Sequence, residues 1–138
     1  MGRNQEWLES RLEQIWNLLF IDVPRKNSVI IKFRGRSKYR FGHITLKGED
    51  TLIIINSLFK NELVPEYIID VTIAHELVHY MHGFHSPLPR LYKYPHQGNI
   101  VNKELIKKGF GHMLKLEKLW VKNNWENIYK IILTITFF

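Results

Sequence analysis

The amino-acid sequence predicts an α+β fold: an N-terminal helix, a small three-stranded twisted sheet, and then helices towards the C-terminus. Two observations support this class. Apolar residues recur at helical spacing near the N-terminus and again after residue 65, and three short runs rich in β-branched and aromatic residues lie between these segments. Because the strands follow one another without intervening helices, the pattern favours an α+β over an alternating α/β arrangement.

The first helix is expected from about Gln5 to Phe20, and the segment "DVPRKN" ends it. Apolar side chains recur in this stretch at helical spacing and would form one buried face. They are Trp7, Leu8, Leu12, Ile15, Trp16, Leu19 and Phe20.

Three strands are expected next, in the segments "SVIIKF", "RFGHITL" and "TLIIIN". The first two would form a hairpin that turns at Gly35 to Lys38 and places its basic side chains on a common side. These side chains are Lys32, Arg34, Arg36, Lys38 and Arg40. Such an alternation is typical of the solvated face of a half-buried hairpin. The alternative is a basic ridge, Lys32 to Arg40, that tracks the phosphates of a nucleic acid.

The remaining segments carry helix signals. A helix begins near Pro65, which suits a first helical position, and ends at Gly83, which suits a C-terminal cap. Two further helices are expected at "NIVNKELIKKG" and "GHMLKLEKLWVKNNWENIY". The second would face the core with Met113, Leu116, Leu119, Trp120 and Val121. The closing "YKIILTITFF" is too short to span a membrane and is predicted to be a last strand or a buried patch.

Composition narrows the possible functions. The length of 138 residues predicts a single domain covering 1–138. The absence of cysteine excludes a disulfide scaffold, a zinc ribbon and a thiol nucleophile, so a metal would be held by His, Asp or Glu. We recognise no signal peptide or membrane span and therefore expect a cytoplasmic location without membrane contact. The net charge of +7 weakly favours an anionic partner.

The most informative segment is "HELVHYMHGFHSPLPRLYKYPH", residues 75–96, which holds five of the seven histidines. His75 and His79 lie four positions apart, about 40° around a helix, so both imidazoles share one face and can bind one ion. Glu76 lies beside them and can accept a proton from a metal-bound water. Zinc suits this nitrogen-rich set. The pattern therefore predicts a zinc site of the H-E-x-x-H kind.

The segment "RFGHITLKGEDTLIIINSLF", followed by "VPEYIIDVTIAHELVH", resembles the SprT-like zincin metallopeptidases and the related WLM-type metal-dependent hydrolases. The shared features are the Phe41-Gly42 pair, a strand ending in Asn56 and a Pro-led helix with H-E-L-V-H, over roughly Arg40 to Leu119. The resemblance implies a compact zincin fold in which a later helix helps to complete the metal site. It also implies that the strand "TLIIIN" edges the cleft and can pair with an extended peptide.

A catalytic zinc usually keeps three protein ligands and one water, so a third ligand is needed. His82 shares the face of His75 but lies about 10 Å further along the helix axis, too far to bind the same ion. His96, at the mouth of the next helix, resembles the third histidine of the SprT-like pattern and is our preferred candidate. The alternatives are Glu104, which would match the gluzincin arrangement, His85, at the WLM spacing, and His112, at the start of a later helix.

The resemblance implies a zinc-dependent metallopeptidase acting on a protein or peptide, with Glu76 as general base and Tyr92 or Tyr94 as donors to the oxyanion. The rival hypothesis is a non-catalytic, metal-stabilised binding protein associated with nucleic acid, in which four protein ligands close the site. A hydrolase with a non-peptide substrate is a third option. The apolar tail from Ile131 to Phe138 is expected to add to a sheet edge or to block the cleft.

Overall fold

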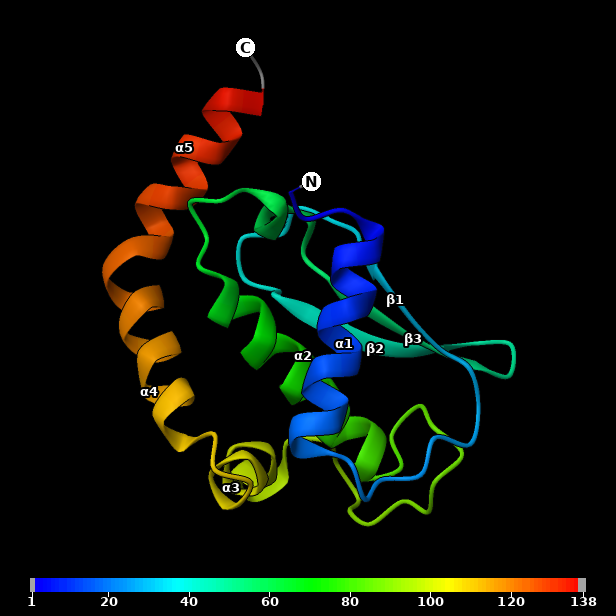
Figure 1. Cartoon of the computed structure of the whole chain (residues 1–138). Coiled ribbons are helices and arrows are strands. Elements are labelled where there is room, and N and C mark those ends of the chain that lie inside the picture. Colours follow the sequence, from blue (N-terminus) through cyan, green and yellow to red (C-terminus); the bar gives the residue numbers. More distant parts are fainter. Residues whose placement is uncertain (1, 137–138) are drawn as a thin grey trace.

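The computed structural model describes residues 2–136 and has the α+β architecture expected from the sequence (Figure 1). Its strands are β1 (Val29–Phe33), β2 (Gly42–Lys47) and β3 (Asp50–Ile55). Its α-helices are α1 (Gln5–Leu19), α2 (Glu66–Met81), α3 (Ile100–Lys107), α4 (Gly111–Trp120) and α5 (Glu126–Thr136). Short 3-10 turns lie at Ser57–Lys60 and Gln97–Asn99, and a π-helical turn at Val121–Trp125 joins α4 to α5.

Helix α1 forms where its apolar spacing predicts it. Its N-cap is Asn4, whose side-chain oxygen accepts a hydrogen bond of 2.8 Å from the backbone N–H of Trp7. The face of α1 that packs against α2 and β1 carries the buried residues Leu8, Leu12, Ile15 and Trp16. This face and the inner side of α2 form much of the apolar core.

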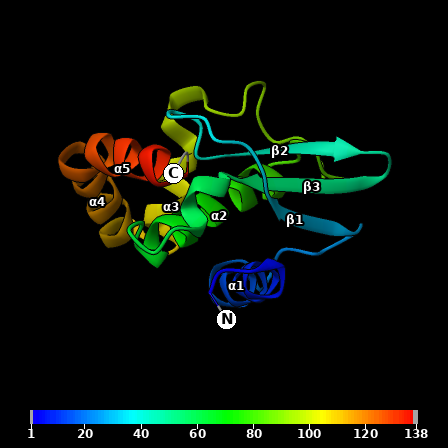
Figure 2. The same cartoon turned by 90° about the horizontal axis from the view of Figure 1, so that it is seen from above.

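The strands form one sheet in the order β1-β3-β2, with β1 parallel and β2 antiparallel to β3 (Figure 2). The predicted hairpin between the first two strands is therefore wrong, because β1 and β2 lie at opposite edges and residues 34–41 connect them. The expectation that the strand "TLIIIN" edges a cleft is also wrong, since β3 is central. Residues 51–55 are buried, which explains their continuous apolar run, typical of a strand covered on both faces.

The edge strand next to α2 is β2, and α2 packs against both β2 and β3. Helix α2 begins one residue later than expected, with Pro65 as its N-cap, and ends with His82 as its C-cap. Gly83 follows with a φ of +83°, in the left-handed region that glycine adopts after a helix end.

The closing segment is helical, so the prediction of a last strand is wrong. In α5, Ile132 is buried, and Ile128 packs against the core one turn earlier, a spacing typical of a helix. The β-branched composition suggested a strand, but packing outweighs intrinsic propensity here. Phe137 and Phe138 lie outside the described residues. Within residues 2–136, no helix is long and apolar enough to cross a membrane.

The preceding helix also differs from expectation, since neither Leu116 nor Leu119 is among the residues that pack against the core. In α4, Trp120 is buried and Met113 packs against the core as expected, but Leu119 is 57% exposed. Leu114, five positions before Leu119, packs against the core, whereas Lys118, which directly precedes Leu119, is exposed. The inner face is therefore centred on residues 113, 117 and 120, about 120° from Leu119.

Candidate metal centre

Helix α2 supplies two of the candidate ligands and is buried on almost every side. Its polar side chains near the site recur at helical spacing and share one face. They are Thr72, His75, Glu76 and His79. Helix α1 holds α2 in place through Arg11, whose guanidinium donates hydrogen bonds to both carboxylate oxygens of Asp70. The helix is thus a rigid support for its two imidazoles.

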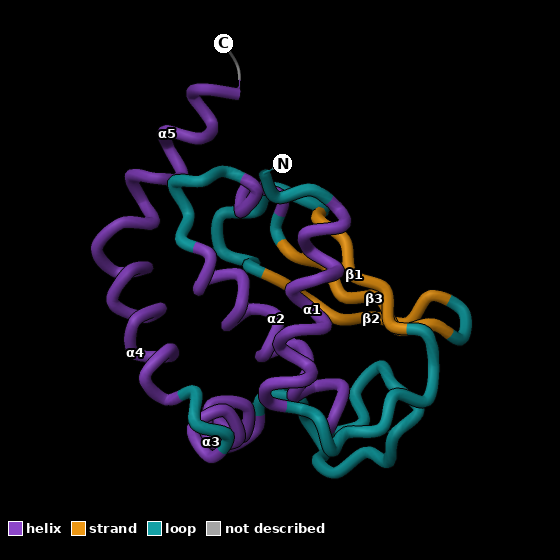
Figure 3. Tube along the Cα trace, in the orientation of Figure 1, coloured by secondary structure: helices purple, strands orange, loops and turns teal. Residues whose placement is uncertain are grey.

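The loop between α2 and α3 brings His96 back to α2 (teal, below the sheet in Figure 3). Gly83 makes this return possible, because a Cβ at that position would overlap the backbone of Pro89. Further along the loop, the Leu91 N–H donates to the carbonyl oxygen of His82 at 3.0 Å. These close contacts fold the loop onto the end of α2, so that His96 is placed just before α3.

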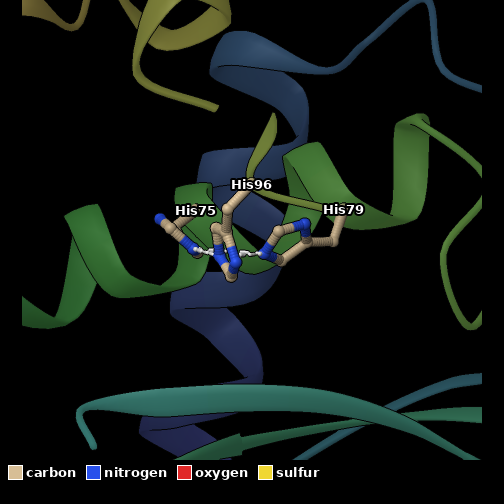
Figure 4. Close-up of side chains that lie close together, drawn as sticks. All are labelled: His75, His79 and His96. Atoms are coloured by element: carbon tan, nitrogen blue, oxygen red, sulfur yellow. Dashed lines mark hydrogen bonds between the residues drawn. The ribbon is translucent and has the colours of Figure 1, made fainter. Parts of the chain in front are cut away.

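The Nε2 atoms of three histidines converge (Figure 4). The Nε2–Nε2 distance is 3.1 Å between His75 and His79, 3.1 Å between His79 and His96, and 3.2 Å between His75 and His96. Each Nε2 carries either a proton or a lone pair, so hydrogen bonds alone would leave at least one pair facing like with like. A metal ion accepts all three lone pairs at once. Among residues 2–136, this is the one group of three or more His, Asp or Glu whose ligand atoms converge, all within 4.8 Å.

The dimensions of the cluster fit zinc. Nitrogen atoms about 2.0–2.1 Å from a tetrahedral zinc ion stand roughly 3.3–3.4 Å apart, close to the 3.1–3.2 Å found here. A donor set of imidazoles alone favours zinc over the oxygen-seeking magnesium and calcium ions. The second ring nitrogen of His79, Nδ1, is buried without a hydrogen-bond partner in the described chain. The Phe84 ring, 6.2 Å away between centroids, packs against the His79 ring.

The other ligand candidates lie outside this cluster. His85 is exposed, with a φ of +55°, and His112 is exposed at the start of α4. Glu104 lies on α3, where its charge acts on the buried His82. The structure therefore brings His96 to the H-E-L-V-H pair and places the alternatives elsewhere.

Burial keeps the imidazoles of His75 and His79 neutral. It lowers the pKa of His75 to about 4 and the pKa of His79 to about 3, and repulsion from His96 acts in the same direction. A neutral imidazole has the free lone pair that metal binding needs. At Glu76 burial has the opposite effect and raises the pKa to about 8, partly opposed by the positive charge of Arg40. A cation bound nearby would also lower the pKa of Glu76 and favour its carboxylate.

The start of β2 and the segment before it lie against α2 and bound the site from the sheet side. Gly42 allows this approach, because a Cβ there would lie only 2.6 Å from Cγ2 of Thr72. Asn56, 2% exposed, holds the same segment: its side-chain amide donates to the carbonyl oxygens of Ser37 at 2.6 Å and Arg40 at 3.0 Å. Two residues of the quoted resemblance, Gly42 and Asn56, thus shape the wall of the site.

A groove of about 1490 Å³ runs from His75 and Glu76 between the segment 38–42, α2 and the helices α4 and α5. Figure 1 shows α4 and α5 as a layer of their own opposite α2. The cationic residues that line the groove are Lys38, Arg40, Lys115, Lys118 and Lys122. The volume exceeds the roughly 300–1,000 Å³ typical of small-molecule sites, which favours an extended ligand.

Glu117 is a groove residue that the sequence analysis missed. It lies on the inner face of α4, lines the groove, and has no hydrogen bond or ion pair within residues 2–136. Burial alone raises the pKa of Glu117 to about 7. The signal in the sequence is a single acidic residue within an apolar helix face, since the positions three and four residues away are Met113, Leu114, Trp120 and Val121.

We expect Glu117→Gln to raise the free energy of unfolding by about 1–3 kcal/mol at pH 8. Folding raises the pKa of this carboxyl to about 7, above its ordinary value of 4.5. Ionised Glu117 therefore destabilises the fold, increasingly so as the pH rises from 4.5 to 7. Urea denaturation of both proteins at pH 5 and pH 8 measures this effect. An equal gain at both pH values, or a loss at pH 8, would contradict the prediction.

Arg40 is a second groove residue, which the sequence analysis placed in a basic ridge and not beside Glu76. It lines the groove, and its charge opposes the rise in the pKa of Glu76. The two tyrosines expected to act as oxyanion donors do not line the groove. The ring of Tyr92 lies against His82, with 4.8 Å between the ring centroids, and Tyr94 is 59% exposed.

Fold and site together define an α+β protein with a three-histidine cluster that could hold a metal ion, beside a buried glutamate. Comparisons of the chain with models of protein families, with curated proteins and with solved structures find no match. The chemistry of the site is therefore inferred from its own residues.

Proposed function

We propose that this protein is a zinc-dependent metallopeptidase in which Glu76 is the general base. The observation that carries the proposal is the convergence of three Nε2 atoms, from His75, His79 and His96, beside a large groove that is lined by His75 and Glu76. Three histidine ligands beside a buried carboxyl are the parts that hydrolysis by a metal-activated water requires.

The resemblance to SprT-like zincins supports the same assignment. The features that carry it lie around the cluster: Gly42 lets β2 approach α2, Asn56 holds the preceding segment, and His96 lies just before a helix. These positions are far apart in the chain, so their proximity in the fold supports the view that they form one functional site.

Zinc bound by the three imidazoles would supply a Lewis acid and lower the pKa of water to near 7. The protein's own part is proton transfer. Glu76 accepts a proton from the attacking water and delivers it to the leaving amine. Its Oε2 atom is buried without a hydrogen-bond partner in the described chain, and burial raises its pKa to about 8. A bound cation would lower this pKa again and favour the carboxylate that accepts the proton.

A peptide is the substrate that the surroundings favour. The groove is large enough for several residues, and among residues 2–136 the edge strand β2 pairs with a strand on one side only. An extended peptide can add to such an edge through backbone hydrogen bonds. A small non-peptide substrate would leave most of the groove unfilled.

A closed structural zinc site would need a fourth protein ligand. Within residues 2–136 only three ligand atoms converge, and the groove reaches His75 directly. Both observations support an open coordination position and therefore catalysis over a purely structural metal.

Zinc-loaded protein is expected to cleave unfolded casein, and its cleavage rate should fall at least about tenfold when a chelator removes the metal. Added zinc should restore cleavage, whereas magnesium should not, because magnesium prefers oxygen ligands. Mass spectrometry of the products identifies the cleaved bonds. Intact casein after incubation with fully zinc-loaded protein would rule out the proposed activity on unfolded proteins.

A further inference from the structure

The groove contains an acidic side chain that the proposed mechanism does not use. Glu117 lines the same cavity as His75 and Glu76, but it comes from α4, on the other side of the groove from α2. Glu117 is half-buried, and its carboxylate has no hydrogen bond or ion pair within residues 2–136. A partly buried acidic group without a partner costs stability, and such groups occur often at functional sites.

Resting on the proposed peptidase function, we propose that Glu117 is the specificity-determining residue of a subsite that accepts a lysine or arginine side chain of the peptide substrate.

Within residues 2–136, no side chain forms an ion pair with Glu117. On a helix, a partner would come from the positions three or four residues away, and all four of these are apolar. The neighbouring lysines Lys115 and Lys118 lie at other positions around the helix, and no ion pair joins them to Glu117 within residues 2–136. By contrast Glu126, in the same groove, is paired with Lys38 at 2.7 Å and Lys130 at 3.5 Å.

The walls around Glu117 suit the stem of a basic side chain. Leu114 and Val121 lie beside it on the same helix face, and Val71 lines the groove from α2. Lysine and arginine carry an aliphatic chain that packs on apolar surface and a charged end that seeks a carboxylate. An apolar substrate residue would cover the half-exposed carboxylate without pairing it, and an acidic one would meet repulsion.

The other charges of the groove limit how basic the substrate can be. Lys115, Lys118 and Lys122 also line the groove, and they would repel a polybasic segment. The preferred substrate is therefore a peptide with one basic residue among neutral or acidic ones.

The experiment compares matched peptides that differ at one position, Lys or norleucine, at the site where cleavage of casein shows basic residues to be enriched. We expect wild type to prefer the Lys peptide by about 10- to 100-fold in kcat/KM. Glu117→Gln should reduce this preference to less than about twofold while still cleaving the norleucine peptide. Glu117→Met provides a second variant without charge. No enrichment of basic residues, or a preference that survives both substitutions, would overturn the inference.

The matched control is Glu126→Gln, which removes the same charge from the same groove where two lysines already neutralise it. This variant should retain the preference for Lys; if it loses the preference as fully as Glu117→Gln does, the general charge of the groove and not Glu117 decides specificity, and the inference fails.

A binding measurement separates this inference from the peptidase proposal. Fluorescence anisotropy measures the affinity for the same two labelled peptides without turnover. It is performed on zinc-loaded Glu76→Gln and on the double variant that also carries Glu117→Gln. Tighter binding of the Lys peptide that depends on Glu117 would support the subsite even if no peptide bond is cleaved. Equal binding of both peptides would overturn it even if the protein proves to be a peptidase.

Discussion

Glu76→Gln is expected to lower kcat/KM for peptide cleavage by about 10²–10⁴-fold while zinc content stays unchanged. Glutamine keeps the shape of the side chain but cannot accept the proton of the attacking water. The three converging histidines are untouched by this change, since they meet through their own Nε2 atoms. Cleavage of a fluorogenic peptide, with elemental analysis of the same sample, measures both quantities.

The matched control for this variant is Glu66→Gln. Glu66 lies on the same helix, α2, but its side chain is 56% exposed, and its contact with Arg11 is a long one of 3.9 Å. This substitution should leave kcat/KM within about twofold, because exposed ion pairs contribute little. Cleavage by zinc-loaded Glu76→Gln at the rate of wild type would mean that another group, or none, acts as the base.

His79→Ala is expected to reduce bound zinc from about one ion per chain to less than about 0.1 after dialysis. The substitution removes one of three converging nitrogens, and loss even of groups that only orient metal ligands weakens binding about 10–100-fold. His75→Ala and His96→Ala should have similar effects, because the three Nε2 atoms form a nearly equilateral triangle. Elemental analysis of each purified variant provides the measurement.

His85→Ala and His112→Ala are the controls for zinc binding, since both histidines are exposed and lie outside the cluster. Both variants should retain zinc. Loss of zinc in Glu104→Ala together with its retention in His96→Ala would show that α3 supplies the third ligand through its glutamate, against the geometry found here.

The helices near the site could be predicted because their signals are local. The spacing of apolar residues in α1, and Gly83 after α2, depend on neighbours within a few turns. Strand order could not be predicted, because it depends on pairing between segments distant in sequence: β1 and β2 follow each other in the chain, yet each pairs with β3. The strand predicted for the C-terminal tail was wrong for a related reason. Its β-branched residues fit a strand by composition, but they pack as the helix α5.

By itself, the sequence determined that His75 and His79 share a helix face with Glu76 beside them, because four residues make about one helical turn. Only the tertiary structure brought His96, and not Glu104, His85 or His112, next to these two histidines. His96 lies 17 positions after His79, and its place depends on how the loop after Gly83 folds back onto α2. The tertiary structure also placed Glu117 opposite α2, since a groove between two helices is a property of packing that no single segment encodes.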